Sequence, residues 1–139
     1  MAHFLVKSEP FKYPWSRMVQ DGTTFWDGVR NYQASNNMKA MQLGDTGFFY
    51  HSNEERAIVG IVEVVKLYYP DHTDETGKFG MVDLKAVAGI KRPVTLTEVK
   101  AEPALQHMQL ATNSRLSVST VDDAAWAHIL QMAGGTVPL

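Results

Sequence analysis

The chain has 139 residues, enough to enclose one hydrophobic core but not two, so a single domain spanning 1–139 is expected. Hydrophobic residues make up 45% and charged residues 20%, which excludes a disordered or low-complexity chain. Thirteen Lys and Arg against fifteen Asp and Glu give a net charge of −2, and there are no cysteines. Charge and cysteine content therefore exclude a strongly basic binder of long duplex DNA, a disulfide scaffold and any site built on thiolates.

The first third of the chain predicts one strand and two helices. The strand runs over His3 to Lys7, since Pro10 biases the residue before it towards extended geometry and has no N–H for a ladder. Pro14 opens a short helix that continues through Val19. A loop from Thr23 to Arg30 then leads to a second helix over Tyr32 to Met41.

The middle of the chain carries the strongest strand signals. Gly47 to His51 and Ala57 to Tyr69 are rich in aromatic and β-branched residues, which is typical of strands. The polar segment Ser52 to Arg56 between them has the length of a hairpin loop. Gly60 predicts a bulge within the second strand, where the sheet bends. A curved sheet follows from this pattern.

Two more strands and two small helices are predicted further on. Alternation over Met81 to Val87 indicates one strand, and Ile90 to Val94 indicates a separate short one. The helices are placed at Thr97 to Ala101 and at Pro103 to Met108. Strands and short helices in this order, without βαβ alternation, indicate an α+β fold with a curved, barrel-like mixed sheet.

The last helix has the clearest pattern. Thr120 is predicted as its N-cap, with Asp123 three residues on, and Gly134 stops it. Four residues share the i, i+3, i+4, i+7 spacing of one buried face: Trp126, Ile129, Leu130 and Ala133. This face is expected to cover the sheet.

Four short segments gather polar, charged and aromatic residues at predicted strand ends or in loops. They are Lys7-Ser8-Glu9-Pro10, Trp26 to Tyr32, Phe49-Tyr50-His51-Ser52 and Arg115-Leu116-Ser117-Val118. A pocket for a nucleobase needs an aromatic wall, amides or hydroxyls for the base edge, and a cation for the phosphate. The four segments supply each of these.

Several of these residues have structural alternatives. Trp26 fills the core or walls a pocket. Arg30 contacts a phosphate or pairs internally with Asp27 or Glu9. The rest of the segment has structural interpretations too, a helix cap for Asn31 and core packing for Tyr32.

A catalytic hypothesis rests on Ser8 as nucleophile and His51 as base, with Glu9 orienting the histidine. No Gly-x-Ser-x-Gly elbow surrounds Ser8, and the five histidines match no zinc-enzyme motif. Acidic residues around His72 are read as a solvated loop rather than a metal site: Asp71, Asp74 and Glu75. No metal and no cofactor is therefore predicted.

The same segments, in the same order, resemble those of the EVE-domain family. Members carry a Lys-Ser-Glu-Pro element near the N-terminus and a Trp-x-Gly-Val-Arg-Asn-Tyr element soon after, matched here by Lys7 to Pro10 and Trp26 to Tyr32. The match continues through Asn36-Asn37-Met38, Phe49 to Ser52, Tyr69-Pro70-Asp71 and Arg115 to Val118. Two positions depart from the family pattern: Ser35, where arginine is frequent, and Phe79-Gly80-Met81, where a tryptophan precedes the Val-Asp strand.

The resemblance implies a PUA-like fold, related to YTH and ASCH domains, and a pocket for a modified base in DNA or RNA. By position, Trp26 and Tyr50 correspond to aromatic walls. Ser8, Asn31 and Ser52 correspond to base-edge contacts, and Lys7, Arg30 and Arg115 to cations. The remaining candidates for the site are Glu9, Tyr32, Asn36, His51 and Ser117.

The predicted function is a non-catalytic binding module for a methylated or hydroxymethylated cytosine-like base. The alternatives are a nucleotide- or RNA-processing enzyme and a small-molecule sensor that uses the same pocket. The expected partner is modified DNA or RNA, with no membrane, and a monomer is favoured although the oligomeric state is open. The absence of a signal peptide and of cysteines predicts a cytoplasmic location.

Overall fold

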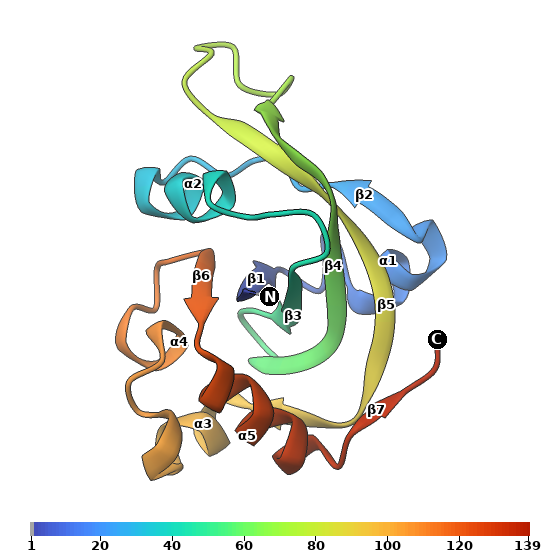
Figure 1. The fold of residues 1–139 in the computed structure, drawn as a ribbon, viewed down its shortest axis with the longest axis vertical. Helices are drawn as coiled ribbons and strands as arrows, with labels where there is room; N and C mark the ends of the chain where they lie inside the picture. The colour runs from blue at the N-terminus through green and yellow to red at the C-terminus, as the bar shows by residue number, and fades with distance from the viewer. Residues whose placement is uncertain (1) are drawn as a thin grey trace.

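The structure, a computed structural model, describes residues 2–139, and its strands form one mixed sheet flanked by short helices (Figure 1). The elements in chain order are β1 (His3–Ser8), α1 (Trp15–Asp21), β2 (Thr23–Phe25), α2 (Tyr32–Lys39), β3 (Thr46–His51), β4 (Ala57–Pro70), β5 (Gly80–Thr95), α3 (Leu96–Ala101), the 3-10 helix η1 (Pro103–Leu105), α4 (Gln109–Thr112), β6 (Val118–Val121), α5 (Asp123–Ala133) and β7 (Thr136–Val137).

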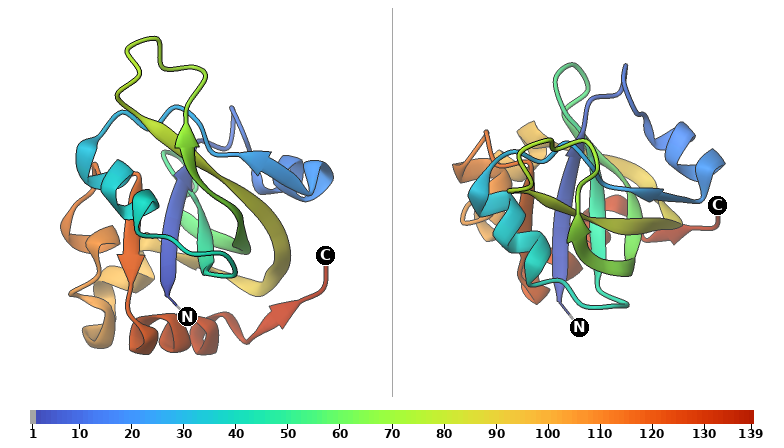
Figure 2. Two further views of the ribbon diagram at one scale, coloured as in Figure 1. Left: turned by 45° about the horizontal axis from the view of Figure 1, so that its top comes forward. Right: turned by 90° about the horizontal axis from the view of Figure 1, so that it is seen from above.

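The sheet has the strand order β2-β5-β4-β3-β1-β6. β7 lies outside this order and pairs with Gly89 and Ile90 of β5. β1 runs parallel to β3, with Lys7 opposite Tyr50, and the other pairs are antiparallel. The long strands β4 and β5 bend around the molecule as one ribbon, which gives the sheet its curved, barrel-like form (Figure 2). The predicted α+β class with a curved mixed sheet is confirmed.

The bend in β4 begins at the predicted bulge. The β4–β5 register shifts between Ile58 and Gly60, and the β3–β4 register shifts on the opposite side, between Phe49 and Tyr50. Gly60 has a second reason to lack a side chain, because a Cβ there would lie 2.3 Å from the ring of Trp15. The bulge bends the strand while the missing side chain lets α1 approach the sheet.

Both faces of the sheet are buried. Neighbouring strand residues point to opposite faces, so Phe49 packs with Trp26 and Met38 on one side while Phe48 packs with Ile129 on the other. The first face is covered by α1, α2 and the loop after β2, the second by α3 to α5 (Figure 1). This explains why β3 and β4 read as nearly continuous apolar runs.

The strand predictions need three corrections. The segment from Thr23 to Arg30 is not wholly loop, because Thr23–Phe25 pairs with β5 as β2. The strands predicted at Met81 to Val87 and Ile90 to Val94 are one strand, β5, held together across the join by pairing of Gly89 with both β4 and β7. β6 and β7 were not anticipated, since both are short and their partners are distant in sequence.

The helix predictions need smaller corrections. The cap of α5 is Asp122, whose carboxylate accepts the Ala125 N–H at 2.7 Å, and not Thr120, which lies in β6 opposite Phe4. The stop at Gly134, in the left-handed region at φ 78°, is confirmed. α2 ends at Lys39, two residues before the predicted end, and only a 3-10 turn forms within Pro103 to Met108. None of the helices within residues 2–139 has the length and hydropathy of a transmembrane span.

Candidate functional site

A cavity, named the larger cavity in comparison with a second one of about 270 Å³, lies on the sheet face covered by α1 and the loop after β2. It has a volume of about 560 Å³, which is within the range of ligand pockets. Its walls come from the end of β1, α1 and the turn before it, β2 and the following loop, and the loop before β6. The lining residues are Lys7, Ser8, Glu9, Lys12, Tyr13, Arg17, Asp21, Thr24, Phe25, Trp26, Asp27, Gly28, Val29 and Ser117.

Trp26 forms the aromatic wall of this larger cavity. Its backbone N–H donates to the carbonyl of Val82 at 2.8 Å, and its ring meets Tyr13 and Phe49 edge-on at centroid distances of 6.3 and 5.7 Å. The residue is 9% exposed, so it belongs to the core as well as to the cavity. Its indole N–H has no hydrogen-bond partner among residues 2–139. Every fully buried side-chain polar atom of the non-exposed residues in that range does have a partner, so this N–H is not fully buried. The indole N–H is therefore a donor that remains accessible to a ligand.

The loop after Trp26 is held by one buried carboxylate. Gly28, at φ 82°, donates its N–H to Asp71 at 2.9 Å, and Arg30 pairs with the same oxygen at 3.0 Å. Burial by itself raises the pKa of Asp71, but hydrogen bonds from Thr73, Gly28 and Arg30 outweigh it and lower the pKa to about 2. Asp71 thus fixes the loop that presents Trp26.

This arrangement corrects two expectations. Arg30 pairs with neither Asp27 nor Glu9 but with Asp71, and it also donates to the Thr73 hydroxyl at 3.0 Å. Asp71 is 3% exposed, so it does not belong to a solvated loop. Residues 2–139 contain no cluster of three or more His, Asp or Glu side chains that could hold a metal.

Charge in the larger cavity is mixed and largely paired. Lys12 lies 3.3 Å from Glu9, and Arg17 lies 3.3 Å from Asp21. Tyr13 donates its hydroxyl to Asp21 at 2.8 Å, and burial together with this bond raises the pKa of the phenol. The Asp27 carboxylate differs, because it has no ion-pair or hydrogen-bond partner among the described residues. The residues that line the cavity therefore include an aromatic ring, an unpaired indole donor and an unpaired carboxylate.

A smaller cavity of about 270 Å³ opens on the other side of Lys7. It is lined by Lys7, Tyr50, Ser52, Asn53, Arg56, Leu96, Lys100, Leu110 and Ser114. Tyr50 follows Phe49 in β3 and so points to the opposite face, away from Trp26. The two predicted aromatic walls therefore belong to different cavities, and Lys7 is the residue that both cavities share.

Ser8 and His51 lie side by side on β1 and β3 but are not arranged as a nucleophile and base. Ser8 donates its hydroxyl to the carbonyl of Tyr13 at 2.6 Å. Nε2 of His51 accepts the backbone N–H of Trp15 at 2.9 Å, so Nδ1 carries the proton and donates it to Glu55. With both groups engaged in this way, the hydrogen bond that a Ser–His pair requires is not formed.

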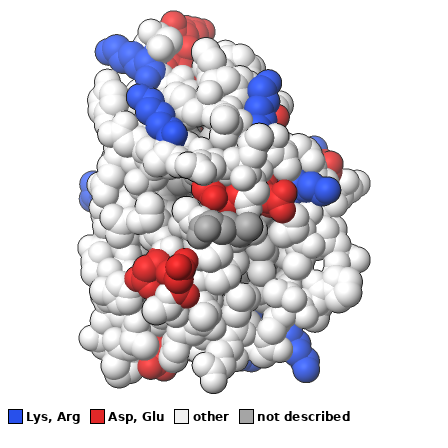
Figure 3. Space-filling view, viewed as in Figure 1, with Lys and Arg blue, Asp and Glu red and all other residues white. Residues whose placement is uncertain are grey.

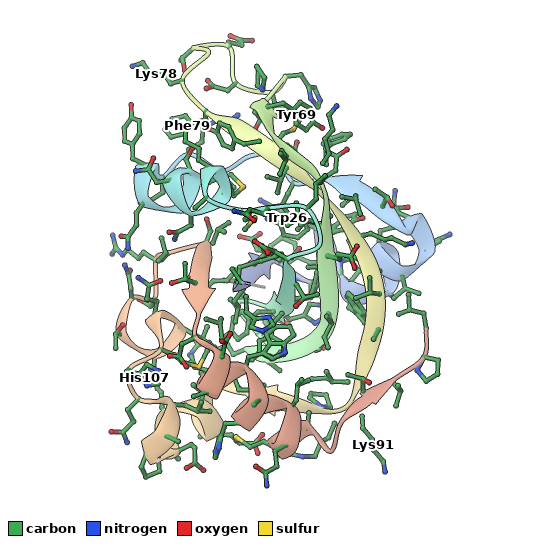
Figure 4. The ribbon with its side chains drawn as sticks, viewed as in Figure 1. Trp26, Tyr69, Lys78, Phe79, Lys91 and His107 are labelled. Carbon is green, nitrogen blue, oxygen red and sulfur yellow. The ribbon has the colours of Figure 1, made fainter. Side chains whose placement is uncertain are left out.

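Several predicted residues lie outside both cavities. Asn31 caps α2 by accepting the Ala34 N–H at 3.0 Å, as expected, and Asn36 is exposed on the same helix. Tyr32 is 63% exposed rather than in the core, and its ring lies 4.9 Å from that of Phe79. Figure 4 shows Phe79 at the outer end of the β4–β5 ribbon, well away from Trp26. His51 and Arg115 also line neither cavity.

The two departures from the family pattern also lie outside the cavities. Ser35 is buried and hydrogen-bonded to the Tyr68 hydroxyl at 2.7 Å, and Phe79 packs on Tyr32. Lys and Arg side chains are scattered in small groups on the face seen in Figure 3, separated by acidic groups. That face has no continuous basic surface for a duplex, in line with the net charge of −2.

Comparison with known proteins assigns the chain to a family. The EVE domain model matches residues 2–132. The chain belongs to the EVE domain family. It is 37% identical over 164 residues to thymocyte nuclear protein 1 of Gallus gallus, covering 94% of this chain and 68% of the relative. The match spans the larger cavity and the loop that Asp71 holds.

Solved structures agree with this EVE assignment. Human THYN1, determined in complex with 5-methylcytosine containing DNA, is 35% identical with a TM-score of 0.90, over 96% of this chain and 98% of that one. The YTH domain of Zygosaccharomyces rouxii MRB1 protein, at 18% identity and a TM-score of 0.60 over 98% and 88% of the two chains, shares the fold alone. The predicted relation to PUA-like and YTH folds is thereby confirmed.

The sequence analysis missed several residues that line the larger cavity or tie the surrounding elements together. Tyr13, Arg17, Asp21 and Thr24 line the larger cavity although no motif marked them. Asp71 lies in one segment that matches the family pattern, and Arg30 lies in another. A pairing between this arginine and this carboxylate could therefore have been predicted from the sequence. Asn37 was also overlooked, although its amide donates to the Val118 carbonyl at 2.8 Å and ties α2 to β6.

Proposed function

We propose that this EVE domain is a binding module that reads a modified cytosine-like base in DNA or RNA, and that the larger cavity receives the base. The proposal rests mainly on the environment of Trp26. Its ring is nearly buried at the wall of a cavity of about 560 Å³, and its indole N–H has no partner within residues 2–139. A relative that was solved with 5-methylcytosine containing DNA supports the same class of ligand.

Recognition combines stacking with edge contacts. The inserted base stacks on Trp26, an interaction worth about 1–3 kcal/mol per base. Asp27 accepts a hydrogen bond from the exocyclic amine of cytosine, which is the contact that carboxylates make with this base. The indole N–H of Trp26 lies in the plane of its ring, so it donates to the sugar-phosphate of the strand and not to the stacked base. Uracil and thymine present a carbonyl where cytosine has the amine, so Asp27 would reject them.

The modification itself contributes modestly. Phe25 and Val29 give the cavity apolar wall where a methyl group can lie. Burying one methyl group contributes about 0.8 kcal/mol, roughly a fourfold preference. A hydroxymethyl group would need one of the cavity's polar side chains to exceed that figure. An isolated domain is therefore expected to prefer the modified base by a small factor.

Fluorescence anisotropy of short labelled oligonucleotides tests the proposal. Matched DNA and RNA strands carry one cytosine that is unmodified, 5-methylated or 5-hydroxymethylated, at low salt. We expect preferential binding of a modified strand, a loss of affinity in Trp26→Phe, which keeps an aromatic ring but removes the indole donor, and a loss of the cytosine preference in Asp27→Ala. The exposed Lys91, which lines neither cavity, provides the control Lys91→Ala.

Uniform failure of all strands to bind at high protein concentration would contradict the proposal. Melting shifts with free nucleosides would then test the small-molecule alternative, and product analysis after incubation with RNA would test the enzyme alternative.

The cytoplasmic location, the favoured monomer and the single-domain organisation over 1–139 stay predictions. The relative from Gallus gallus is named as a nuclear protein.

A further inference from the structure

The smaller cavity differs from the larger one in the sign of its charge. Three of its lining residues are cations, Lys7, Arg56 and Lys100, and none is acidic. None of the three forms an ion pair with another residue of the described chain, 2–139. Glu55, in the same hairpin as Arg56, is turned to His51 instead. The cavity is therefore a concave surface with uncompensated positive charge.

The other polar groups of this cavity can all donate hydrogen bonds. Tyr50 is 3% exposed, and its hydroxyl has no hydrogen-bond partner among residues 2–139. Every fully buried side-chain polar atom of the non-exposed residues in this range has a partner, so this hydroxyl is not fully buried. Because Tyr50 lines the cavity, we infer that its hydroxyl faces the cavity. Ser52 and Ser114 add hydroxyls, and Asn53 adds an amide. Three cations and four neutral donors around one space suit an anion with several acceptor oxygens.

The hairpin between β3 and β4 holds two of these groups in unusual backbone conformations. Asn53 and Arg56 have φ of 69° and 50°, in the left-handed region that side chains other than glycine seldom adopt. Arg56 donates Nε to the Asn53 carbonyl at 2.9 Å, which leaves its terminal amino groups for a ligand, and its carbonyl accepts the Leu96 N–H at 2.8 Å. Such strain persists where surrounding contacts require it, and it is concentrated at functional sites.

Lys7 connects this cavity to the larger one. Its ammonium donates to the Ser114 carbonyl at 3.0 Å, and burial lowers its pKa, a cost that a bound anion would relieve. In a nucleic acid, each base is one sugar away from its phosphate. A strand whose base enters the larger cavity therefore brings a phosphate close to Lys7.

We propose that the smaller cavity is a phosphate site, formed by Arg56, Lys100, Lys7 and the Tyr50 hydroxyl, that holds a backbone phosphate of the strand whose base enters the larger cavity. This inference rests on the proposed function in one respect, because a bound nucleic-acid strand is the source of the phosphate. The affinity of the site for a phosphate group is independent of the proposed function. Neither Arg56 nor Lys100 lies in a motif that carried the family resemblance.

The test uses Arg56→Ala and Lys100→Ala, both exposed positions, in the full chain, with Lys91→Ala as control. In the first arm, inorganic phosphate is titrated against chloride at equal ionic strength while the backbone amide resonances of Tyr50, Ser52 and Asn53 are followed. We expect saturable shifts in the wild type and in the control, and their loss in both variants.

The second arm measures oligonucleotide affinity by anisotropy over a series of salt concentrations. Each of the two variants should lose about tenfold or more in affinity. The slope of log K against log salt should fall by about 0.7 to 1. The loss should be equal for modified and unmodified strands, because a phosphate carries no information about the base.

The outcomes separate this inference from the proposed function. Phosphate-induced shifts that depend on Arg56 and Lys100 would support the anion site. If Trp26→Phe at the same time left oligonucleotide binding unchanged, the base pocket would be contradicted. Unchanged oligonucleotide affinity in both variants would overturn the assignment of the site to a strand phosphate. Absence of shifts in the first arm together with an unchanged salt slope in the second would overturn the site altogether.

Discussion

The two cavities are built in opposite ways. The larger one takes its wall from Trp26, which is also part of the core, and its carboxylates and cations are mostly paired with each other. The smaller one takes its charge from Arg56 and Lys100, exposed side chains that form no ion pair within residues 2–139. A ring suits the neutral face of a base, and unpaired cations suit a phosphate.

This difference separates stability from binding. Substitution of Trp26 in the larger cavity alters packing and binding together, because the same side chain serves both. Substitution of Arg56 or Lys100 in the smaller cavity removes charge and leaves the core unchanged. The following predictions test that separation, from the largest expected effect to the smallest.

Trp26→Ala should lower the free energy of unfolding by about 3–5 kcal/mol, the usual cost of truncating a buried aromatic residue. Trp26 contacts Tyr13 and Phe49, so its loss leaves a void between α1 and the sheet. Urea unfolding at neutral pH measures the change, with Arg56→Ala as the matched variant that should stay within about 0.5 kcal/mol of wild type. A loss below about 1 kcal/mol would mean that Trp26 serves the cavity alone.

Asp71 should stabilise the fold through its ionised form. Its folded pKa of about 2 lies below the ordinary value of 3.8, so its contribution of about 2 kcal/mol is present above that value and is lost as the pH falls through 4 to 2. Asp71→Asn should be less stable than wild type by about this amount at neutral pH. Urea unfolding of both proteins as a function of pH measures the difference, which should shrink towards zero near pH 2. A difference independent of pH would contradict the assignment.

Asp122→Ala should cost about 1 kcal/mol of stability, as the loss of a helix N-cap usually does, without changing either cavity. Thr120→Ala, in β6, should change stability by less than about 0.5 kcal/mol. Thermal melting of the two variants distinguishes the caps. Equal losses would show that Thr120 contributes to capping after all, and weaker oligonucleotide binding in Asp122→Ala would show that the cavities depend on α5.

Local patterns predicted the elements with strong periodicity. β1, β3 and β4 were placed within a residue or two, because their apolar runs exceed what a loop would carry. β2 and β6 were missed because three or four residues carry little periodicity, and long-range pairing decides their state. The same cause explains the error at Thr120, whose pairing with Phe4 overrides its capping propensity.

The candidate site was predicted in composition but not in arrangement. The motifs supplied Lys7, Ser8, Glu9, Trp26 and Ser117 of the larger cavity. The grouping of Tyr50 with Trp26 ignored the alternation of side chains along β3, which places Phe49 rather than Tyr50 beside the tryptophan. The smaller cavity was beyond sequence reasoning, since Arg56, Lys100 and Ser114 meet there only through the fold.

The most direct test of the base pocket follows the three indole N–H resonances of the protein during titration with an oligonucleotide that contains 5-methylcytosine. Trp26 should shift saturably, while Trp126, stacked between His3 and Phe48 on the other sheet face, should remain in place as an internal control. Saturable binding that leaves the Trp26 resonance unmoved would contradict the central claim that the base enters the larger cavity.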